Sequence, residues 1–209
     1  MTKFEEIDKL LEQNDGYLFS KDVEKAGISR TYLASYVKER GLEKVSKGIY
    51  ISPDTWEDEL YILQLRYPKV IFSGETALYL HEMIDREYSQ ITVTVPPRFN
   101  RTRLLSEGVV IRQEQEASYN LGITELQTNF GNTVRVYDVE KTICDLVKLR
   151  GKIEVQHYQT AIKSYMRRKD KDLTRLLKYA ETLKIRDEIM KYIEVMDQKL
   201  FCYMRNLYL

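Results

Sequence analysis

Residues 29–48 carry the side chains best suited to a chemical task, and that task is binding phosphate. The stretch holds five Lys or Arg against two Glu, although the whole 209-residue chain has a formal net charge of only +1. Because salt confines the field of a charge to about 8–10 Å, a local surplus attracts a polyanion even on a nearly neutral protein. The pattern of predicted helices and strands around this stretch indicates which polyanion it would bind.

The elements expected around these residues are those of a winged helix-turn-helix. Apolar residues at helical spacing predict a first helix over about 2–13, and Ser20 is expected to cap a short second helix that Gly27 closes. Ser29 is expected to cap a third helix, which ends at Gly41 and runs into two strand-like pieces, LEKV and GIYIS, joined by SK. This order predicts a DNA-binding module over residues 1–52.

Two parts of this module are predicted to contact DNA. The third helix would enter the major groove by its N-terminal half, and the hairpin would lay its lysines along the phosphates. The predicted contact residues are Ser29, Arg30, Thr31, Tyr32, Ser35, Lys38, Lys44 and Lys47. A three-helix module used only for protein contacts is the alternative interpretation of the same pattern.

The remainder of the chain predicts a connecting helix and a second domain. Residues 53–68 have an apolar stripe typical of an amphipathic helix, containing Trp56 and Leu60. From Lys69 onward, strand patterns such as QITVTV, GVVIRQ and TVRVYD alternate with helix patterns, and after Arg150 only helix patterns follow. The predicted fold class is α+β, with an N-terminal winged helix-turn-helix followed by a mixed α/β domain at 69–209 that ends in several helices.

The sequence offers little for catalysis or for a metal. His81 and Asp85 are four residues apart and could face one ion, but no third or fourth ligand has a recognisable spacing. Ser73-Gly74 reverses the Gly-Ser turn of some nucleotidyltransferases, and no Asp-x-Asp motif follows it. We therefore expect a protein that is not an enzyme and has no catalytic residue, cofactor or metal.

The sequence also indicates the cellular compartment in which we expect the protein. No apolar run reaches the roughly 18 residues that a membrane span needs, and the acidic, amphipathic N-terminus does not resemble a signal peptide. Cys144 and Cys202 lie far apart among apolar residues, so we expect both to be buried thiols in a reducing cytoplasm.

A second basic segment lies near the C-terminus. Residues 148–191 hold thirteen Lys or Arg against six Asp or Glu. Cations at a helix C-terminus interact favourably with the helix dipole, but that explains only one or two per helix. The segment predicts a possible second basic face formed by Lys163, Arg167, Arg168 and Lys169, with plain solvated surface as the alternative.

Four segments, in this order, resemble the AbiE-type abortive-infection antitoxins: FSGETALYLHEM, ITVTVPP, YDVEKTICDLVK and YQTAIKSYMRRKDKDLTRLLKYAETL. The resemblance runs from the winged helix to about Met196. It implies the antitoxin of a bacterial type IV toxin–antitoxin system for phage defence, which binds inverted repeats in double-stranded DNA of its own promoter and represses its operon. It also implies neutralisation of a nucleotidyltransferase-like toxin without a stable complex.

Two other mechanisms of antitoxicity remain open from the sequence. The protein could bind the toxin directly, with the winged helix secondary, or it could be an enzyme that reverses the toxin's modification. The absence of metal and nucleophile motifs counts against the second. The final thirteen residues lie outside the resemblance.

Overall fold

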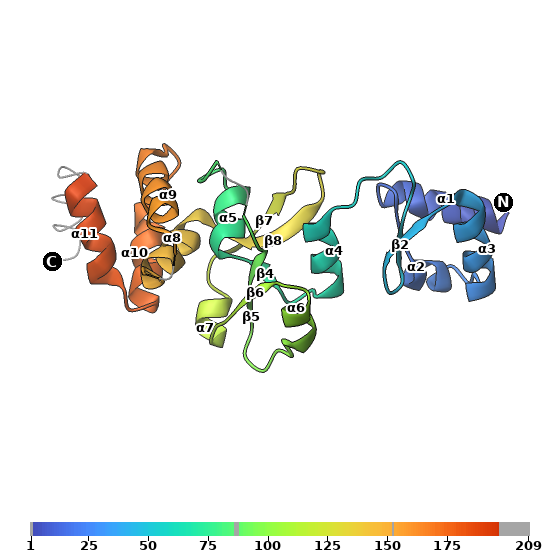
Figure 1. Ribbon diagram of the computed structural model, residues 1–209, viewed down its shortest axis with the longest axis horizontal. Helices are drawn as coiled ribbons and strands as arrows, with labels where there is room; N and C mark the ends of the chain where they lie inside the picture. Colours follow the sequence, from blue (N-terminus) through green and yellow to red (C-terminus); the bar gives the residue numbers. More distant parts are fainter. Residues whose placement is uncertain (1, 86–87, 152, 197–209) are drawn as a thin grey trace. The chain divides into compact units, whose positions relative to one another are not determined.

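The computed structural model describes residues 2–85, 88–151 and 153–196, and its elements are labelled in Figure 1. The chain forms two compact units. The first consists of Met1–Pro68 together with Gln127–Asn132, and the second of Lys69–Leu126 together with Thr133–Leu209. The first unit is therefore discontinuous in sequence.

The first unit is a winged helix. Its helices and strands alternate as the fold requires: α1 (Lys3–Gln13), β1 (Tyr17–Phe19), α2 (Ser20–Lys25), α3 (Arg30–Arg40), β2 (Glu43–Ser46), β3 (Ile49–Ile51) and α4 (Glu59–Arg66). The strands form an antiparallel sheet in the order β1-β3-β2, of which β2 and β3 are the wing. The predicted N-terminal fold is confirmed.

Local sequence signals explain the ends of these helices. The Thr2 hydroxyl accepts a hydrogen bond from the Glu5 amide while the Glu5 carboxylate accepts from the Thr2 amide, which is a capping box. Ser29 caps α3 by accepting from the Tyr32 amide at 3.4 Å. Gly27 closes the turn with φ +73°, a conformation that glycine adopts cheaply. Inside, α1, α2 and α3 pack around Ile7, Leu18, Val23, Ile28, Leu33, Tyr36 and Leu42.

Two local predictions for this unit were wrong, and one strand was missed. Strand β1 was not foreseen, because its three residues are all buried and lack the alternation that identifies a strand. Ser20 is the first residue of α2 and not its cap, since Phe19 occupies the cap position without a side-chain bond. The connecting helix begins only at Glu59, capped by Asp58, so Trp56 lies outside it and is 79% exposed.

The second unit is built on a five-stranded mixed sheet in the order β6-β5-β4-β8-β7. Strand β4 pairs antiparallel with β5 and parallel with β8, and β5 pairs parallel with β6. The strands are β4 (Ile71–Phe72), β5 (Thr92–Val95), β6 (Val110–Gln113), β7 (Ile123–Gln127) and β8 (Thr133–Tyr137). The predicted combination of mixed sheet and late helices is confirmed.

The helices of the second unit are α5 (Gly74–Leu80), α6 (Thr102–Ser106), α7 (Glu116–Tyr119), α8 (Val139–Lys148), α9 (Val155–Arg167), α10 (Leu173–Thr182) and α11 (Arg186–Met196). Of these, α5, α9, α10 and α11 pack against α8. Helix α8 is buried along most of its length and begins where Asp138 accepts from the Lys141 amide at 2.8 Å. Its Ile143, Leu146 and Val147 join side chains of α5, α9, α10 and α11 in the largest apolar cluster.

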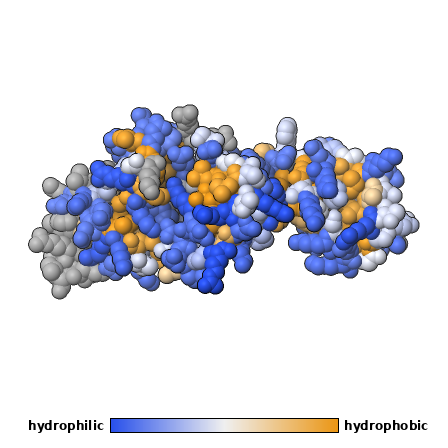
Figure 2. All heavy atoms as spheres, turned by 60° about the horizontal axis from the view of Figure 1, so that its bottom comes forward, coloured by the Kyte–Doolittle hydropathy of each residue, from blue (hydrophilic) through white to orange (hydrophobic). Residues whose placement is uncertain are grey.

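Hydrophilic residues cover most of the face shown in Figure 2, and hydrophobic residues appear there as separate patches. Within the described ranges, no helix is long and apolar enough to cross a membrane.

Candidate nucleic-acid interface

The rotation of α3 about its axis is fixed by its buried residues. Leu33 and Tyr36 are 4% and 0% exposed and turn one side of the helix into the core. Because side chains three and four residues apart share a helix face, Thr31, Ser35 and Lys38 project on the opposite side, where all three are exposed. The outer face of α3 is thus polar and accessible.

A hydrogen-bonded triad on the inner side holds α3 against α1. The Tyr36 hydroxyl donates to the Asp8 carboxylate at 2.6 Å, and the Arg40 guanidinium pairs with the same carboxylate at 2.8 Å. Burial and then Asp8 raise the pKa of Tyr36, so the hydroxyl stays a donor. Arg40 is therefore directed to α1, and its charge belongs to this triad.

Tyr32 lies at the border between the outer face of α3 and helix α1. Its ring meets the Phe4 ring edge-on at a centroid distance of 6.4 Å, and the Lys3 ammonium lies 4.6 Å above it. Tyr32 is 46% exposed, so its ring remains partly accessible at this border.

Arg30 is not free on this face. Its Nε lies 2.6 Å from Glu24 Oε1 of α2, with side chains that are 85% and 43% exposed. Glu24 raises the pKa of Arg30, mainly through this hydrogen bond. Arg30 must leave a solvent-exposed ion pair to reach a base, and Glu24 adds a negative charge beside the helix that would approach DNA.

The wing presents two exposed lysines. Lys44 lies opposite Tyr50 in the β2–β3 ladder, and a register shift follows before Ser46. Lys47 and Gly48 join the strands, so the predicted Ser46–Lys47 joint was one residue early. The carbonyl oxygen of Gly48, at φ +75°, accepts a hydrogen bond from the Ser20 amide at 2.9 Å and ties the wing tip to α2.

The second basic segment does not form one uniform group. Lys163, Arg167 and Lys169 are exposed. Arg168 is occupied within the fold, because its guanidinium donates to the Asp170 carboxylate at 3.0 and 2.8 Å and to the His81 carbonyl oxygen at 3.2 Å. It fastens the end of α9 to the end of α5.

Sequence reasoning missed a buried ion pair inside α8. The Lys141 ammonium donates to both carboxylate oxygens of Asp145, at 2.6 and 2.7 Å, and lies 4.3 Å from the centroid of the Tyr137 ring. The two side chains are 0% and 7% exposed. Burial raises the pKa of Asp145, whereas Lys141 opposes that shift. The i,i+4 spacing of opposite charges within the helix pattern VEKTICDLVK was the available signal.

The remaining titratable candidates have structural partners. His81 donates from Nε2 to the Tyr137 carbonyl oxygen at 2.7 Å, and burial lowers its pKa. His157 Nδ1 lies 3.4 Å from a Glu75 carboxylate oxygen. Across the described ranges, no group of three or more His, Cys, Asp or Glu could hold a metal.

Cys144 is a free thiol in the core, as expected. It contacts the Leu176 carbonyl oxygen at 3.7 Å, and burial raises its pKa, which makes it a poor nucleophile. Cys202 lies outside the described residues.

A family comparison bears on the first unit and the beginning of the second. Residues 5–86 match the model of the family described as transcriptional regulator, AbiEi antitoxin N-terminal domain. This segment is similar to the AbiEi antitoxin N-terminal domains. The predicted resemblance is confirmed over these residues.

Comparison with whole proteins adds evidence on the fold. No curated protein matches the chain. The crystal structure of the RV2827C protein from Mycobacterium tuberculosis superposes with a TM-score of 0.54 at 12% identity, covering 87% of this chain and 74% of that chain. At this identity the likeness concerns the fold alone, and it extends over both units.

Proposed function

We propose that this protein is a DNA-binding antitoxin that represses its own operon through inverted repeats in the promoter. The observation that carries the proposal is the outer face of α3, where Thr31, Ser35 and Lys38 stand clear of the core beside a wing bearing Lys44 and Lys47. Helix and wing would share the task, with α3 reading base edges in the major groove and the wing contacting phosphates.

The inner side of α3 supports this role. A recognition helix must hold its side chains in a fixed register, because base-edge hydrogen bonds tolerate little displacement. Tyr36 and Arg40 both bind Asp8 of α1, and Ser29 fixes the first turn. The helix therefore meets DNA as a rigid element.

For the second unit we propose the antitoxic role, against a nucleotidyltransferase-like toxin in the bacterial cytoplasm and without a stable complex, as in type IV systems. Direct binding of the toxin is the competing mechanism. Gel filtration of the full chain mixed with the purified toxin separates the two, since co-elution would favour direct binding. An enzymatic mechanism finds no support in the buried ion pair of α8, which has no access to solvent.

We propose that the second basic face consists of three of the four predicted residues. Lys163, Arg167 and Lys169 remain available for a polyanion, whereas Arg168 is engaged with Asp170 and His81.

Nuclease footprinting of the DNA upstream of the gene, with the full-length protein, tests operator binding. We expect protection of two repeats related by a dyad, because half-site symmetry mirrors the pairing of two winged helices on the duplex. Uniform weak protection, without a bounded footprint, would contradict a specific operator.

Replacing Arg30 and its partner should change operator affinity in opposite directions. Arg30→Ala is expected to weaken binding by about 1–3 kcal/mol, the value of a good base contact. Glu24→Gln should tighten binding, because it releases Arg30 and removes a negative charge facing the phosphates. Gel-shift titration measures both.

Lys9→Ala, which removes an exposed cation from α1, is the matched control and should leave the affinity unchanged. Equal affinities for the Arg30→Ala variant and the parent would remove Arg30 from the interface. A weaker Glu24→Gln variant would show that the ion pair positions Arg30 for binding instead of withholding it.

The wing lysines should contribute through phosphate alone. Lys44→Ala and Lys47→Ala should each weaken binding to specific and unrelated DNA alike, and each should lower the slope of log affinity against log salt by about 1. Affinity measured at several salt concentrations checks this. A loss restricted to the operator would show that the wing reads bases.

A further inference from the structure

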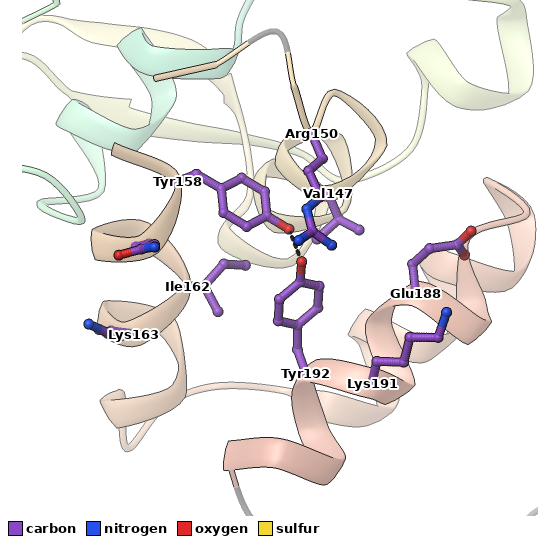
Figure 3. A pocket seen from close by; sticks show the side chains of 9 residues that line it. Val147, Arg150, Tyr158, Ile162, Lys163, Glu188, Lys191 and Tyr192 are labelled. Carbon is purple, nitrogen blue, oxygen red and sulfur yellow. Dashed lines mark hydrogen bonds between the residues drawn. The ribbon is translucent and has the colours of Figure 1, made fainter. Parts of the chain in front are cut away.

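Residues of α9, α11 and the end of α8 line an open-sided cavity of about 370 Å³ in the second unit, shown in Figure 3. Its interior is apolar, formed by Val147, Ile162 and the rings of Tyr158 and Tyr192. Ligand pockets in proteins have volumes of about 300–1,000 Å³, so the cavity is at the small end of that range. An apolar body of moderate length would fill it.

Two tyrosine hydroxyls face one another within this cavity (Figure 3). Tyr158 donates to the Tyr192 oxygen at 2.5 Å. Two hydroxyls carry two hydrogens, and their mutual bond uses one, so one O–H remains to donate to a ligand. The remaining O–H is that of Tyr192, because Tyr158 is the donor of the mutual bond. Burial raises the pKa of Tyr158, so Tyr158 keeps the proton that it donates to Tyr192.

The charges around the cavity favour an anion. Arg150, Lys163 and Lys191 line it against a single carboxylate, Glu188. In Figure 3 the Arg150 side chain extends toward the two hydroxyls, whereas the Lys163 ammonium is turned away from them. The guanidinium carbon of Arg150 lies 5.9 Å from the centroid of the Tyr158 ring. A carboxylate at this point would gain a hydroxyl donor and a guanidinium partner.

We propose that this cavity binds an amphipathic carboxylate, namely a medium-chain fatty acid. Its alkyl chain would lie among Val147, Ile162 and the two tyrosine rings, and its carboxylate would accept from the free tyrosine hydroxyl and pair with Arg150. A nucleotide or another highly polar anion fits less well, because the apolar walls would leave its polar groups without hydrogen bonds.

Calorimetric titration of the full chain with decanoate tests the proposal, with decylammonium as a probe of the same length and opposite charge. We expect saturable binding of one decanoate per chain and no saturable binding of decylammonium. Ile162→Trp, which fills the cavity, should abolish binding, and Arg150→Gln should weaken it about tenfold or more. Tyr192→Phe, which keeps the ring, should weaken it about threefold to tenfold.

Lys178→Gln, which removes an exposed cation from α10 away from the cavity, is the control and should bind decanoate like the parent. The proposal is overturned if decanoate fails to saturate up to about 1 mM. It is equally overturned if decylammonium binds as well as decanoate. If Ile162→Trp does not fold, the Arg150→Gln and Tyr192→Phe variants decide alone, and parental affinity in both contradicts the site.

Discussion

A Lys141→Met variant is expected to lose about 3–5 kcal/mol of unfolding free energy, because it removes the ammonium that is hydrogen-bonded to the buried Asp145 carboxylate. In the parent the ammonium is within 2.7 Å of both carboxylate oxygens, and neither side chain exceeds 7% exposure. Water cannot replace the lost partner in such a site. Urea unfolding followed by circular dichroism measures the loss.

The double variant Lys141→Met/Asp145→Leu is the control, since it removes both charges and should recover most of the stability. The deficit of the single variant should also shrink as the pH falls. Burial raises the pKa of Asp145, so the native state takes up a proton before the unfolded state does and gains stability relative to it. A single variant within about 1 kcal/mol of the parent would show that water or a nearby cation compensates the carboxylate.

Asp58→Ala is expected to destabilise the first unit by about 2–4 kcal/mol. The Asp58 carboxylate is 1% exposed, caps α4 through the Tyr61 amide, and accepts from Thr128 Oγ1 at 2.5 Å and Asn132 Nδ2 at 2.8 Å. Removing the carboxylate leaves the Tyr61 amide and the two side-chain donors without their hydrogen-bond acceptor. Chemical unfolding monitored by the fluorescence of Trp56, the only tryptophan, reports on this region.

Asp54→Ala changes an exposed aspartate four residues away and should have almost no effect. Asp58→Asn keeps one acceptor oxygen and should lose less stability than Asp58→Ala. If Asp58→Ala and Asp54→Ala were equally stable, the bonds to Thr128 and Asn132 would contribute nothing to the unit.

The sequence was sufficient for features set by neighbours along the chain. Ser29 before a helical pattern and Gly27 in the preceding turn predicted the start of α3, because capping and positive φ depend on a few adjacent residues. Asp138 identified the start of α8 in the same way. The strands of the second unit were recognisable because runs such as TVTV are rich in β-branched residues.

Contacts between distant segments were not predictable in this way. The Arg30–Glu24 pair depends on the angle between α2 and α3, and the bond from Arg168 to the His81 carbonyl oxygen joins residues 87 positions apart. Both change how many cations are available at the candidate interfaces. Strand β1 was not predicted from the sequence, because a strand of three buried residues shows no alternation of apolar and polar side chains.

The discontinuity of the first unit has a consequence for its synthesis. Asp58 leaves the ribosome 70 residues before its partner Thr128. Because synthesis adds about 5–20 residues per second, several seconds pass before the Asp58 carboxylate can form its hydrogen bonds with residues 128 and 132. During that interval the nascent chain also produces strands β4 to β7. A message cut short within that region yields a winged helix without the hydrogen bonds from Thr128 and Asn132 to Asp58. The complete first unit therefore forms only from a chain that has already made most of its second sheet.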